Sequence, residues 1–451
     1  MGFNVSDRAA TAAPLAPPAR PSRRLVLGGH VVFTLINTVL FSNAVWLVTL
    51  LVRLHFGSAD AATRDWQTTL VTAAVPTCFL LSIFWHELLR RVTLRTYLAV
   101  FWLVAALPLG CIAFVHSYGQ LLLCHLVATV GFAGWAPVNG KLLKSFYDDA
   151  IRGRMYAALN VVALGGGIAA VYVVGRWMEA APEAFRPYFV GAALLQVAGL
   201  AILVRLARLT GMPDEPARAE PWRTAVLRPL RNMHAILRTD RRFRRYEIAF
   251  MNYGAAFMIC EALLPVLTTT QLGMGYKEYA HMTQVAAKVV TLVLTLPMGW
   301  LLDRIGPMRT SAVAFAGLGA YPLLLLAATG PWGIAAASSA FGFGMAGVAM
   351  GWMLGPVILA GSAERVPQYV AIHATLVGIR GVVFQGVGMG LYRLTGSFTW
   401  PLFAAAAAFI WAAVQMWRLH RELPAGVASA PPPEPASADP VLATEGAAES
   451  R

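Results

Sequence analysis

The chain has 451 residues, of which 58% are hydrophobic and only 13% are charged. Soluble proteins carry about 25% charged residues, so this composition argues against a large soluble enzyme and indicates a membrane protein. The net charge of +14 does not indicate nucleic-acid binding, because the basic residues stand in short segments between apolar runs and form no basic arm with interleaved aromatic residues.

Apolar runs long enough to cross a membrane occur about twelve times along the chain. The hydrocarbon core of a bilayer is about 30 Å thick, and a helix needs about 20 mostly apolar residues to span it. The sequence therefore predicts an all-α polytopic membrane protein with about twelve transmembrane helices. The first six are 25–52, 66–85, 96–116, 119–140, 154–176 and 185–206, and the second six are 246–268, 281–302, 309–328, 332–358, 367–394 and 398–418.

Both ends of the chain are predicted to be disordered tails. Residues 1–24 form a short cytoplasmic tail, and the apolar run that follows is too long for the core of a signal peptide, so it should remain as the first helix. Residues 421–451 are rich in proline, alanine and acidic residues and have no apolar period. Such a segment cannot bury a core.

A basic central segment, 207–245, divides the helices into two six-helix bundles, 25–206 and 246–420. Eleven arginines stand between Arg205 and Arg245. The second part of the segment has apolar residues at helical spacing, which predicts a short amphipathic helix on the membrane surface with its arginines near anionic headgroups. A solvated linker is the alternative.

Lysine and arginine are distributed unevenly between the two sets of connecting loops. Cytoplasmic loops of membrane proteins carry the excess of these residues. We therefore expect both termini and the central segment in the cytoplasm, and the chain in the inner (plasma) membrane of a bacterium. The richer set holds the central segment and Arg90, Arg91, Arg95, Lys141, Lys144, Arg152, Arg154, Arg304 and Arg309, and the poorer set holds Arg53, Arg64, Arg176, Arg186, Lys277 and Arg393.

The most specific motif is GWLLDRIGPMR, residues 299–309, between the eighth and ninth predicted helices. Gly299 would allow a neighbouring helix to approach closely, and Gly306 would allow a tight turn. Asp303 would accept hydrogen bonds from the free N–H groups at a helix N-terminus, where the helix dipole favours an anion. Arg304 and Arg309 would anchor the turn to headgroups and acidic neighbours.

This motif resembles the G-x-x-x-D-R-x-G-x-x-[RK] signature of the major facilitator superfamily, both in sequence and in its cytoplasmic position. The resemblance implies two parallel six-helix repeats and secondary transport by alternating access. Matches between the halves agree with it, since Asn37 in the first helix aligns with Asn252 in the seventh. The resemblance is not specific for a subfamily, and we expect a monomer without a cofactor.

A second segment, DDAIRGR at 148–154, resembles the acidic-then-R-G-R entry to the fifth helix that is common in this superfamily. By the same resemblance, Asp303 should contact the start of the fifth helix, near Arg152 and Arg154, when the cytoplasmic side is closed. The equivalent loop of the first half departs from the pattern, because His86 and Glu87 stand where an aspartate and an arginine are expected.

Three charged residues fall inside predicted helices, where a charge costs about 2.5–3.5 kcal/mol and usually faces a partner or a cavity. Glu261, Lys288 and Arg380 should share one depth, about 20–23 Å from the cytoplasmic ends of their helices. We interpret them as a site for an anionic solute, with Glu261 as a proton carrier. The alternative is a structural Glu261–Arg380 pair. Further polar candidates are His125, Asn37, Asn252 and His373.

Functions other than solute transport receive less support from the sequence. A membrane-embedded enzyme would need a nucleophile with a base, a metal cluster or paired carboxylates, and the sequence offers none, so no enzyme and no metal site are expected. A transporter-like sensor or scaffold and an efflux pump for drugs or metabolites remain alternatives. Four cysteines lie inside apolar runs without metal-ligand spacing: Cys78, Cys111, Cys124 and Cys260.

Overall fold

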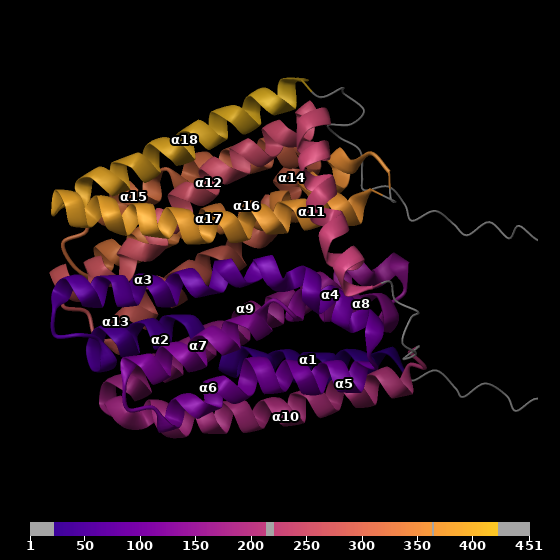
Figure 1. Ribbon diagram of the computed structural model, residues 1–451, viewed down its shortest axis with the longest axis horizontal. Coiled ribbons are helices and arrows are strands. Elements are labelled where there is room, and N and C mark those ends of the chain that lie inside the picture. The colour runs from indigo at the N-terminus through magenta and orange to yellow at the C-terminus, as the bar shows by residue number, and fades with distance from the viewer. Residues whose placement is uncertain (1–21, 213–220, 363–364, 423–451) are drawn as a thin grey trace, which may run out of the picture.

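The computed structural model describes residues 22–212, 221–362 and 365–422, and in this part of the chain every regular element is helical (Figure 1). The predicted disordered tails lie almost wholly outside the described residues, as does part of the central segment.

The helices of the two halves follow one another along the chain. The first half contains α1 (Arg23–Phe41), α2 (Ala44–Leu51), α3 (Ala61–Cys78), α4 (Ser82–Arg91), α5 (Leu94–Phe101), α6 (Leu107–Cys111), α7 (Tyr118–Phe132), α8 (Trp135–Phe146), α9 (Asp149–Ala180) and α10 (Phe185–Leu209). After α11 (Trp222–Thr239), the second half contains α12 (Arg241–Val266), α13 (Tyr276–Tyr279), α14 (Ala286–Leu318), α15 (Ala320–Ala327), α16 (Pro331–Ala360), α17 (Val366–Thr395) and α18 (Thr399–Glu422). Short π-helical or 3-10 turns continue these helices: η1 (Val52–Phe56), η2 (Phe79–Leu81), η3 (Trp102–Ala106), η4 (Ile112–Phe114), η5 (Pro182–Ala184), η6 (Leu267–Gln271) and η7 (Ala280–Val285).

Eleven helical stretches of the described residues are long and apolar enough to cross a membrane. One of them, Tyr276–Ala327, has 52 residues and is far longer than one crossing requires. Gly306 breaks it, because its φ of 77° and ψ of 167° are not helical. With this stretch counted as two crossings, the chain crosses twelve times, and the all-α polytopic fold predicted from the sequence is confirmed.

The twelve crossings form two bundles that lie side by side (Figure 1). Each bundle has hydrophobic cores of its own, and the core of the second half draws its buried residues only from that half. We call the end that carries residue 22, the segment joining α10 to α12 and residue 422 the terminal end. We call the opposite end the loop end.

Within each bundle, an asparagine on the first crossing bonds a glutamine on the last crossing. Asn37 of α1 accepts a hydrogen bond from Gln196 of α10 at 2.9 Å. Asn252 of α12 donates one to Gln415 of α18 at 2.7 Å. In each half, the first crossing is therefore tied to the last crossing by an asparagine–glutamine pair. This correspondence agrees with the internal repeat, and it gives both asparagines a structural role within their own halves.

The helix α11 lies across the terminal end, between the bundles (Figure 1). Its apolar side chains Met233, Ile236 and Leu237 pack against the core of the second half. Near its start, the Trp222 ring lies 4.4 Å from the guanidinium carbon of Arg91 in α4. This helix therefore contacts both halves at the end where their connection runs.

Candidate substrate and coupling site

A cluster of polar side chains joins the two halves at the loop end. Arg53 in η1 donates to the Asp65 carboxylate of α3 at 2.6 Å, and both side chains are almost fully buried. Arg53 also donates to two hydroxyls of the other half, those of Thr269 and Thr270 in η6, at 2.9 and 2.6 Å. Arg393 of α17 donates to the second Asp65 oxygen at 3.3 Å. We call these five residues the loop-end latch. It contains two arginines and one aspartate.

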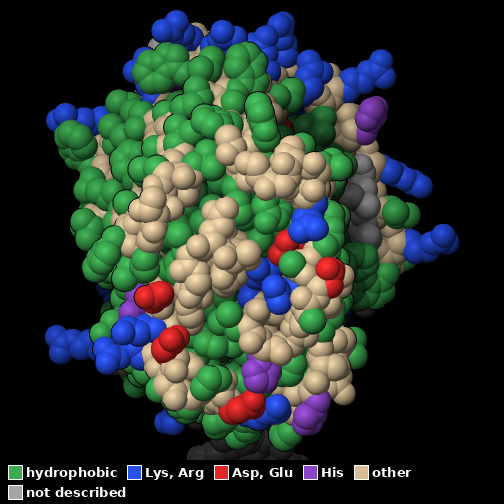
Figure 2. All heavy atoms as spheres, turned by 90° about the vertical axis from the view of Figure 1, so that its left-hand side faces the viewer, with side chains coloured by type: hydrophobic (Ala, Val, Ile, Leu, Met, Phe, Trp, Pro, Cys, Tyr) green, Lys and Arg blue, Asp and Glu red, His purple; other side chains and the backbone are tan. Residues whose placement is uncertain are grey.

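Further contacts close the loop end beside the latch. The His281 ring of η7 donates to the Tyr172 carbonyl of α9 at 3.1 Å and stacks on the Tyr172 ring, with 4.4 Å between centroids. The backbone N–H of Lys277 donates to the Glu179 carboxylate at 3.2 Å. Figure 2 faces this end and shows acidic and basic side chains near its middle, with side chains filling the space between the halves. The halves are therefore in contact at the loop end.

The helices α3 and α17 continue this contact toward the middle of the molecule, where two glycines let them approach closely. A Cβ atom on Gly381 would lie 2.5 Å from the Pro76 Cβ, and one on Gly378 would lie 2.5 Å from the Leu80 Cγ. Real Cβ atoms do not approach other atoms so closely. Any larger side chain at either glycine would push the two halves apart.

The contact predicted for the terminal end is not formed. Asp303 is exposed and, within the described parts of the chain, it makes no hydrogen bond or ion pair. At the start of α9, Arg152 donates to the Tyr147 carbonyl at 3.4 Å, and Arg154 is exposed. The structure is thus closed at the loop end, and the predicted bridge from Asp303 to α9 is absent in this state.

The other residues of the 299–309 motif lie around the turn at Gly306, whose positive φ of 77° favours glycine. Gly299 does not provide a close helix approach. A Cβ there would meet only the end of the Met350 side chain, at an ordinary 3.7 Å. The neighbouring helix is therefore not close enough at this level to require glycine, and the expectation for Gly299 is wrong for this state.

The two arginines of the motif contact tryptophan rings. The guanidinium carbon of Arg304 lies 4.0 Å from the centre of the Trp300 ring, one helical turn earlier. That of Arg309 lies 5.5 Å from the Trp417 ring of α18. Cation–π contacts of this kind hold the turn against the last helix of its own bundle.

Two opposite charges stand close to the border between the halves. Lys288 of α14 and Glu261 of α12 are half-buried and lie within electrostatic range of each other. Lys288 donates to Gln284 at 3.2 Å, and its Cε lies 3.8 Å from the position of a Cβ on Gly167 of α9. Within the described residues, no direct ion pair joins Glu261 and Lys288. The lysine thus reaches the facing half without a carboxylate bonded to it.

Arg380 lies at a different depth from Glu261. Its guanidinium donates to the Phe250 carbonyl at 2.7 Å. It also lies directly against Gly254 of α12, so closely that a Cβ atom on Gly254 would collide with Nε. Glu261 stands seven residues beyond Gly254 on α12, about 10 Å nearer the loop end. The prediction of one shared depth is wrong, and the alternative Glu261–Arg380 pair is absent. The reason is that α12 begins at Arg241, earlier than predicted.

The carboxylate near Arg380 is Glu247, which sequence reasoning missed. It is almost fully buried, and both of its oxygens lie 3.0 Å from Nδ1 of His373, which is equally buried. Arg380 is within electrostatic range of it. Glu247 follows the run RRFRRY and is the second residue of the predicted helix 246–268, but it is not among the predicted site residues. The available signal was an acidic residue inside a predicted transmembrane helix.

His125 is tied into the first half, away from the charges of the second. It is fully buried in α7, and its Nε2 lies 3.0 Å from the Val71 carbonyl of α3. Together with the asparagine–glutamine pairs, this contact shows that the structure does not bring His125, Asn37 or Asn252 together with Glu261 and Lys288. Each of these three candidates joins helices within its own bundle, His125 and Asn37 in the first half and Asn252 in the second.

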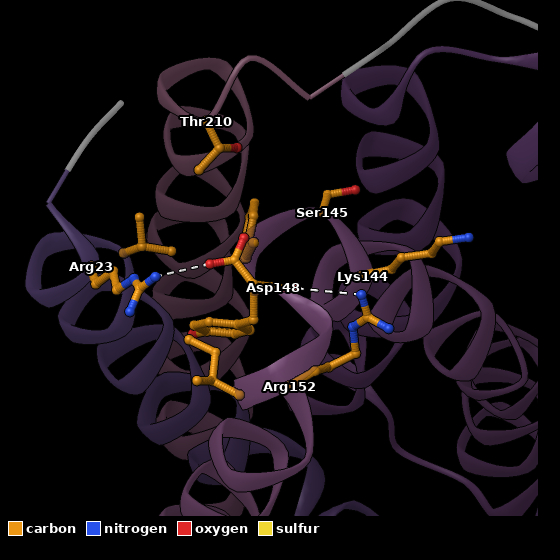
Figure 3. A pocket seen from close by; sticks show the side chains of 10 residues that line it. Arg23, Lys144, Ser145, Asp148, Arg152 and Thr210 are labelled. Carbon is orange, nitrogen blue, oxygen red and sulfur yellow. Dashed lines mark hydrogen bonds and ion pairs between the residues drawn. The ribbon is translucent and has the colours of Figure 1, made fainter. Parts of the chain in front are cut away.

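A basic cavity of about 530 Å³ opens at the terminal end of the first half (Figure 3). Arg23 points to Asp148 across it at 3.0 Å, and Lys144 and Arg152 line the other side. Both partners of that ion pair are largely exposed, so it stabilises little. The cavity is lined only by the first half. It is therefore not a site between the two bundles.

Comparison with known proteins agrees with this architecture. The family model described as the Major Facilitator Superfamily matches residues 26–383. The chain belongs to this superfamily. It is therefore a membrane transporter and not an enzyme, as expected from the sequence. No curated protein sequence matches this transporter.

Solved structures similar to this transporter show the same fold at low sequence identity. A POT family transporter in complex with 5-aminolevulinic acid has a TM-score of 0.69 and 12% identity, covering 87% of this chain and 95% of its own. The nucleoside transporter NupG has a TM-score of 0.66 and 14% identity, covering 88% and 99%. The human organic anion transporter MFSD10 has a TM-score of 0.60 and 17% identity, covering 89% and 99%.

Proposed function

We propose that this transporter carries a small solute with an anionic group by alternating access, and that it does so with a proton. Lys288 supports this proposal most directly. Its ammonium group stands at the border of the halves, beside Gly167 of the facing bundle, with no carboxylate bonded to it. A partly dehydrated cation attracts an anion strongly. Glu261 lies near enough to hold a cationic group of the same solute.

We propose further that the terminal end faces the cytoplasm, because the lysine- and arginine-rich loops lie there. The latch then closes the outer side of the membrane, and the absent Asp303 bridge belongs to the inner side. The similar structures named above include an organic anion transporter and a POT family transporter in complex with 5-aminolevulinic acid. This likeness agrees with the proposed substrate class.

Uptake by the purified transporter in liposomes tests the proposal. A panel of radiolabelled organic anions and amino acids would be offered with and without a pH gradient. We expect accumulation of at least one anionic or zwitterionic solute in the wild type. The Lys288→Gln variant should lose roughly tenfold or more of it, because a partly buried charge partner is removed. Lys277→Gln, an exposed lysine at the loop end, is the matched control. Equal loss in both variants would remove Lys288 from the site.

A further inference from the structure

A buried acid–base couple lies between α12 and α17, apart from Glu261 and Lys288. Nδ1 of His373 lies 3.0 Å from both oxygens of Glu247, and both side chains are at most 4% exposed. When Glu247 is ionised, its carboxylate can only accept hydrogen bonds, and Nδ1 of His373 is then the donor. The other ring nitrogen, Nε2, then has a free lone pair. It is buried and has no hydrogen-bond partner in the described part of the chain.

The surroundings of the couple are almost entirely aromatic. The centre of the His373 ring lies 5.0 Å from that of Phe250, 5.4 Å from that of Trp352 and 5.7 Å from that of Tyr246. The Tyr246 hydroxyl donates a hydrogen bond to the Gly351 carbonyl at 3.0 Å. The helix α16, which supplies Trp352, has no charged residue in its sequence.

Arg380 on α17 is the charged group that faces the couple from the loop-end side. It lies within electrostatic range of Glu247, and its Nε is buried without a partner among the described atoms. With neutral His373, the negative Glu247 and the positive Arg380 give the group a net charge of zero. Adding one proton makes the charge +1 in a bundle that faces lipid, where an unbalanced charge is costly.

A cavity opens at the terminal end, and one of its lining residues, Tyr369, lies one helical turn before His373. A cavity of about 670 Å³ is lined by Asp240 and Tyr369, whose side chains bond at 2.7 Å, and by three arginines. Tyr369 precedes His373 by one helical turn on the same face of α17. The Tyr369 ring also packs on Phe243, with 4.3 Å between centroids. The acid–base groups of α12 and α17 thus follow one another from this cavity inward.

We propose that Glu247 and His373 form the proton-binding site of this transporter, loaded from the terminal end past Asp240 and Tyr369. The proton adds to the Nε2 lone pair of His373 and forms an imidazolium that Glu247 holds. No bond other than this N–H forms. The site rests on the proposed function, since it supplies the proton that travels with the anion. An anionic solute offsets the charge that the proton brings, so the two are carried together.

The burial of Nε2 fits this role. A carrier that exchanged its proton freely with both sides in every state would leak protons. A site closed off by aromatic rings exchanges only when the helices around it move. If the two states bind the proton with different affinity, proton binding shifts the balance between states closed and open at the loop end.

The test measures that balance without any solute. The four native cysteines are replaced by alanine, and spin labels are attached at Ala59→Cys and Trp332→Cys, exposed loop-end positions in the first and second halves. The distance between the labels is recorded in lipid nanodiscs from about pH 5 to pH 8, the range in which histidine usually changes charge. We expect the ratio of open to closed populations to change roughly fivefold or more, the usual size of such a coupling.

The variants His373→Gln and Glu247→Gln should each make this ratio nearly independent of pH. The matched control is His30→Gln, which removes a buried histidine of the first half that bonds the Tyr147 hydroxyl at 3.1 Å. It should keep the wild-type profile. Trp352→Phe provides a readout in a protein that keeps both acid–base groups. The pH-dependent part of the tryptophan emission should disappear in it, because an imidazolium beside the indole quenches its fluorescence.

A wild-type ratio that does not change with pH would overturn the proposal. The proposal would also be overturned if the open-to-closed ratio still changed with pH in folded His373→Gln, or if the tryptophan emission of Trp352→Phe still changed with pH. These outcomes are distinct from failure of the proposed function. That failure would appear as no solute uptake at all in the liposome panel, whether or not the label distance depends on pH.

Discussion

Asp65 is a single carboxylate that holds two arginines in the loop-end latch. Burying charged groups is costly unless each is paired and hydrogen-bonded. Here the threonine hydroxyls of the opposite half accept hydrogen bonds from Nε and Nη2, the two Arg53 nitrogens that do not bond Asp65. The Arg53–Asp65 pair lies within the first half, whereas the bonds of Arg53 to the two threonines and of Arg393 to Asp65 form only when the two halves meet. The complete latch is therefore present only when the loop end is closed.

The variant Asp65→Asn should favour opening of the loop end. It keeps the shape of the side chain but leaves two positive arginines close together without their carboxylate. Removing one partner of a buried pair costs about 3–5 kcal/mol, and only the part lost on closing shifts the equilibrium. We expect at least a tenfold rise in the open population, measured by the distance between labels at positions 59 and 332. Asp60→Asn, an exposed helix cap nearby, is the control. An unchanged distance distribution would show that the latch does not hold this end closed.

The partner of Arg380 can be identified by a double-mutant cycle. Glu247→Gln and Arg380→Gln should each destabilise the transporter by about 3–5 kcal/mol, because each leaves a buried charge uncompensated. The double variant should be more stable than the sum of the two losses predicts. Combining Arg380→Gln with Glu261→Gln should give additive losses, since the structure separates these residues. Melting curves in detergent measure the stability of each single and double variant and show which pair of losses is non-additive. Coupling to Glu261 in place of Glu247 would contradict the arrangement of these charges in the structure.

At the scale of elements, the contact between α3 and α17 depends on small residues. Gly378 and Gly381 allow close approach at two successive turns, whereas on the same helix a Cβ added to Gly386 would have no atom within 4 Å. The sequence contains all three glycines without distinguishing them. The facing helix belongs to the other half, so the difference between them is a property of the assembled pair.

Gly381→Ala should weaken this contact, while Gly386→Ala should not. The added methyl group at position 381 would collide with Pro76, at a cost of typically 1–3 kcal/mol for overpacking. Because only the closed loop end brings α3 this close, the open population should rise. At position 386, alanine is neutral or stabilises the helix by up to about 1 kcal/mol. Label distances and melting curves of both variants provide the measurement, and similar behaviour of the two would argue against a close-packed seam.

The whole molecule is organised by the two halves, which meet firmly at one end only. The latch, the stacked His281–Tyr172 pair and the α3–α17 seam lie at the loop end or extend from it. Transport by alternating access requires a second state in which these contacts separate and contacts at the terminal end form. Asp303 and the start of α9 are the groups available there.

The proposed orientation in the membrane rests on the loop charges and can be measured on intact cells. Single cysteines at Ala59 and Ser362 lie at opposite ends of the bundle, and both positions are exposed. With the terminal end in the cytoplasm, an impermeant thiol reagent should label position 59 and leave position 362 unlabelled until the cells are opened. Labelling of both positions, or of position 362 alone, would refute the proposed orientation.

Much of this architecture follows from the sequence by itself. The hydrocarbon core demands long apolar helices, so twelve crossings and the all-α fold follow from composition and run length. The turn at Gly306 follows from a motif that needs a positive φ at one glycine. Such features depend on local chemistry, and they survive errors of several residues in the helix ends.

Only the tertiary structure decided which charges meet. Counting from predicted helix ends placed Glu261 and Arg380 at one level. In the structure α12 begins five residues earlier than predicted, and Arg380 lies against Gly254, about 10 Å along the helix from Glu261. The same extension drew Glu247 into the bundle, where it faces His373. A depth error of one or two turns does not alter the fold, because any apolar register fills a bilayer. It changes every polar contact, because a hydrogen bond or ion pair tolerates less than 1 Å.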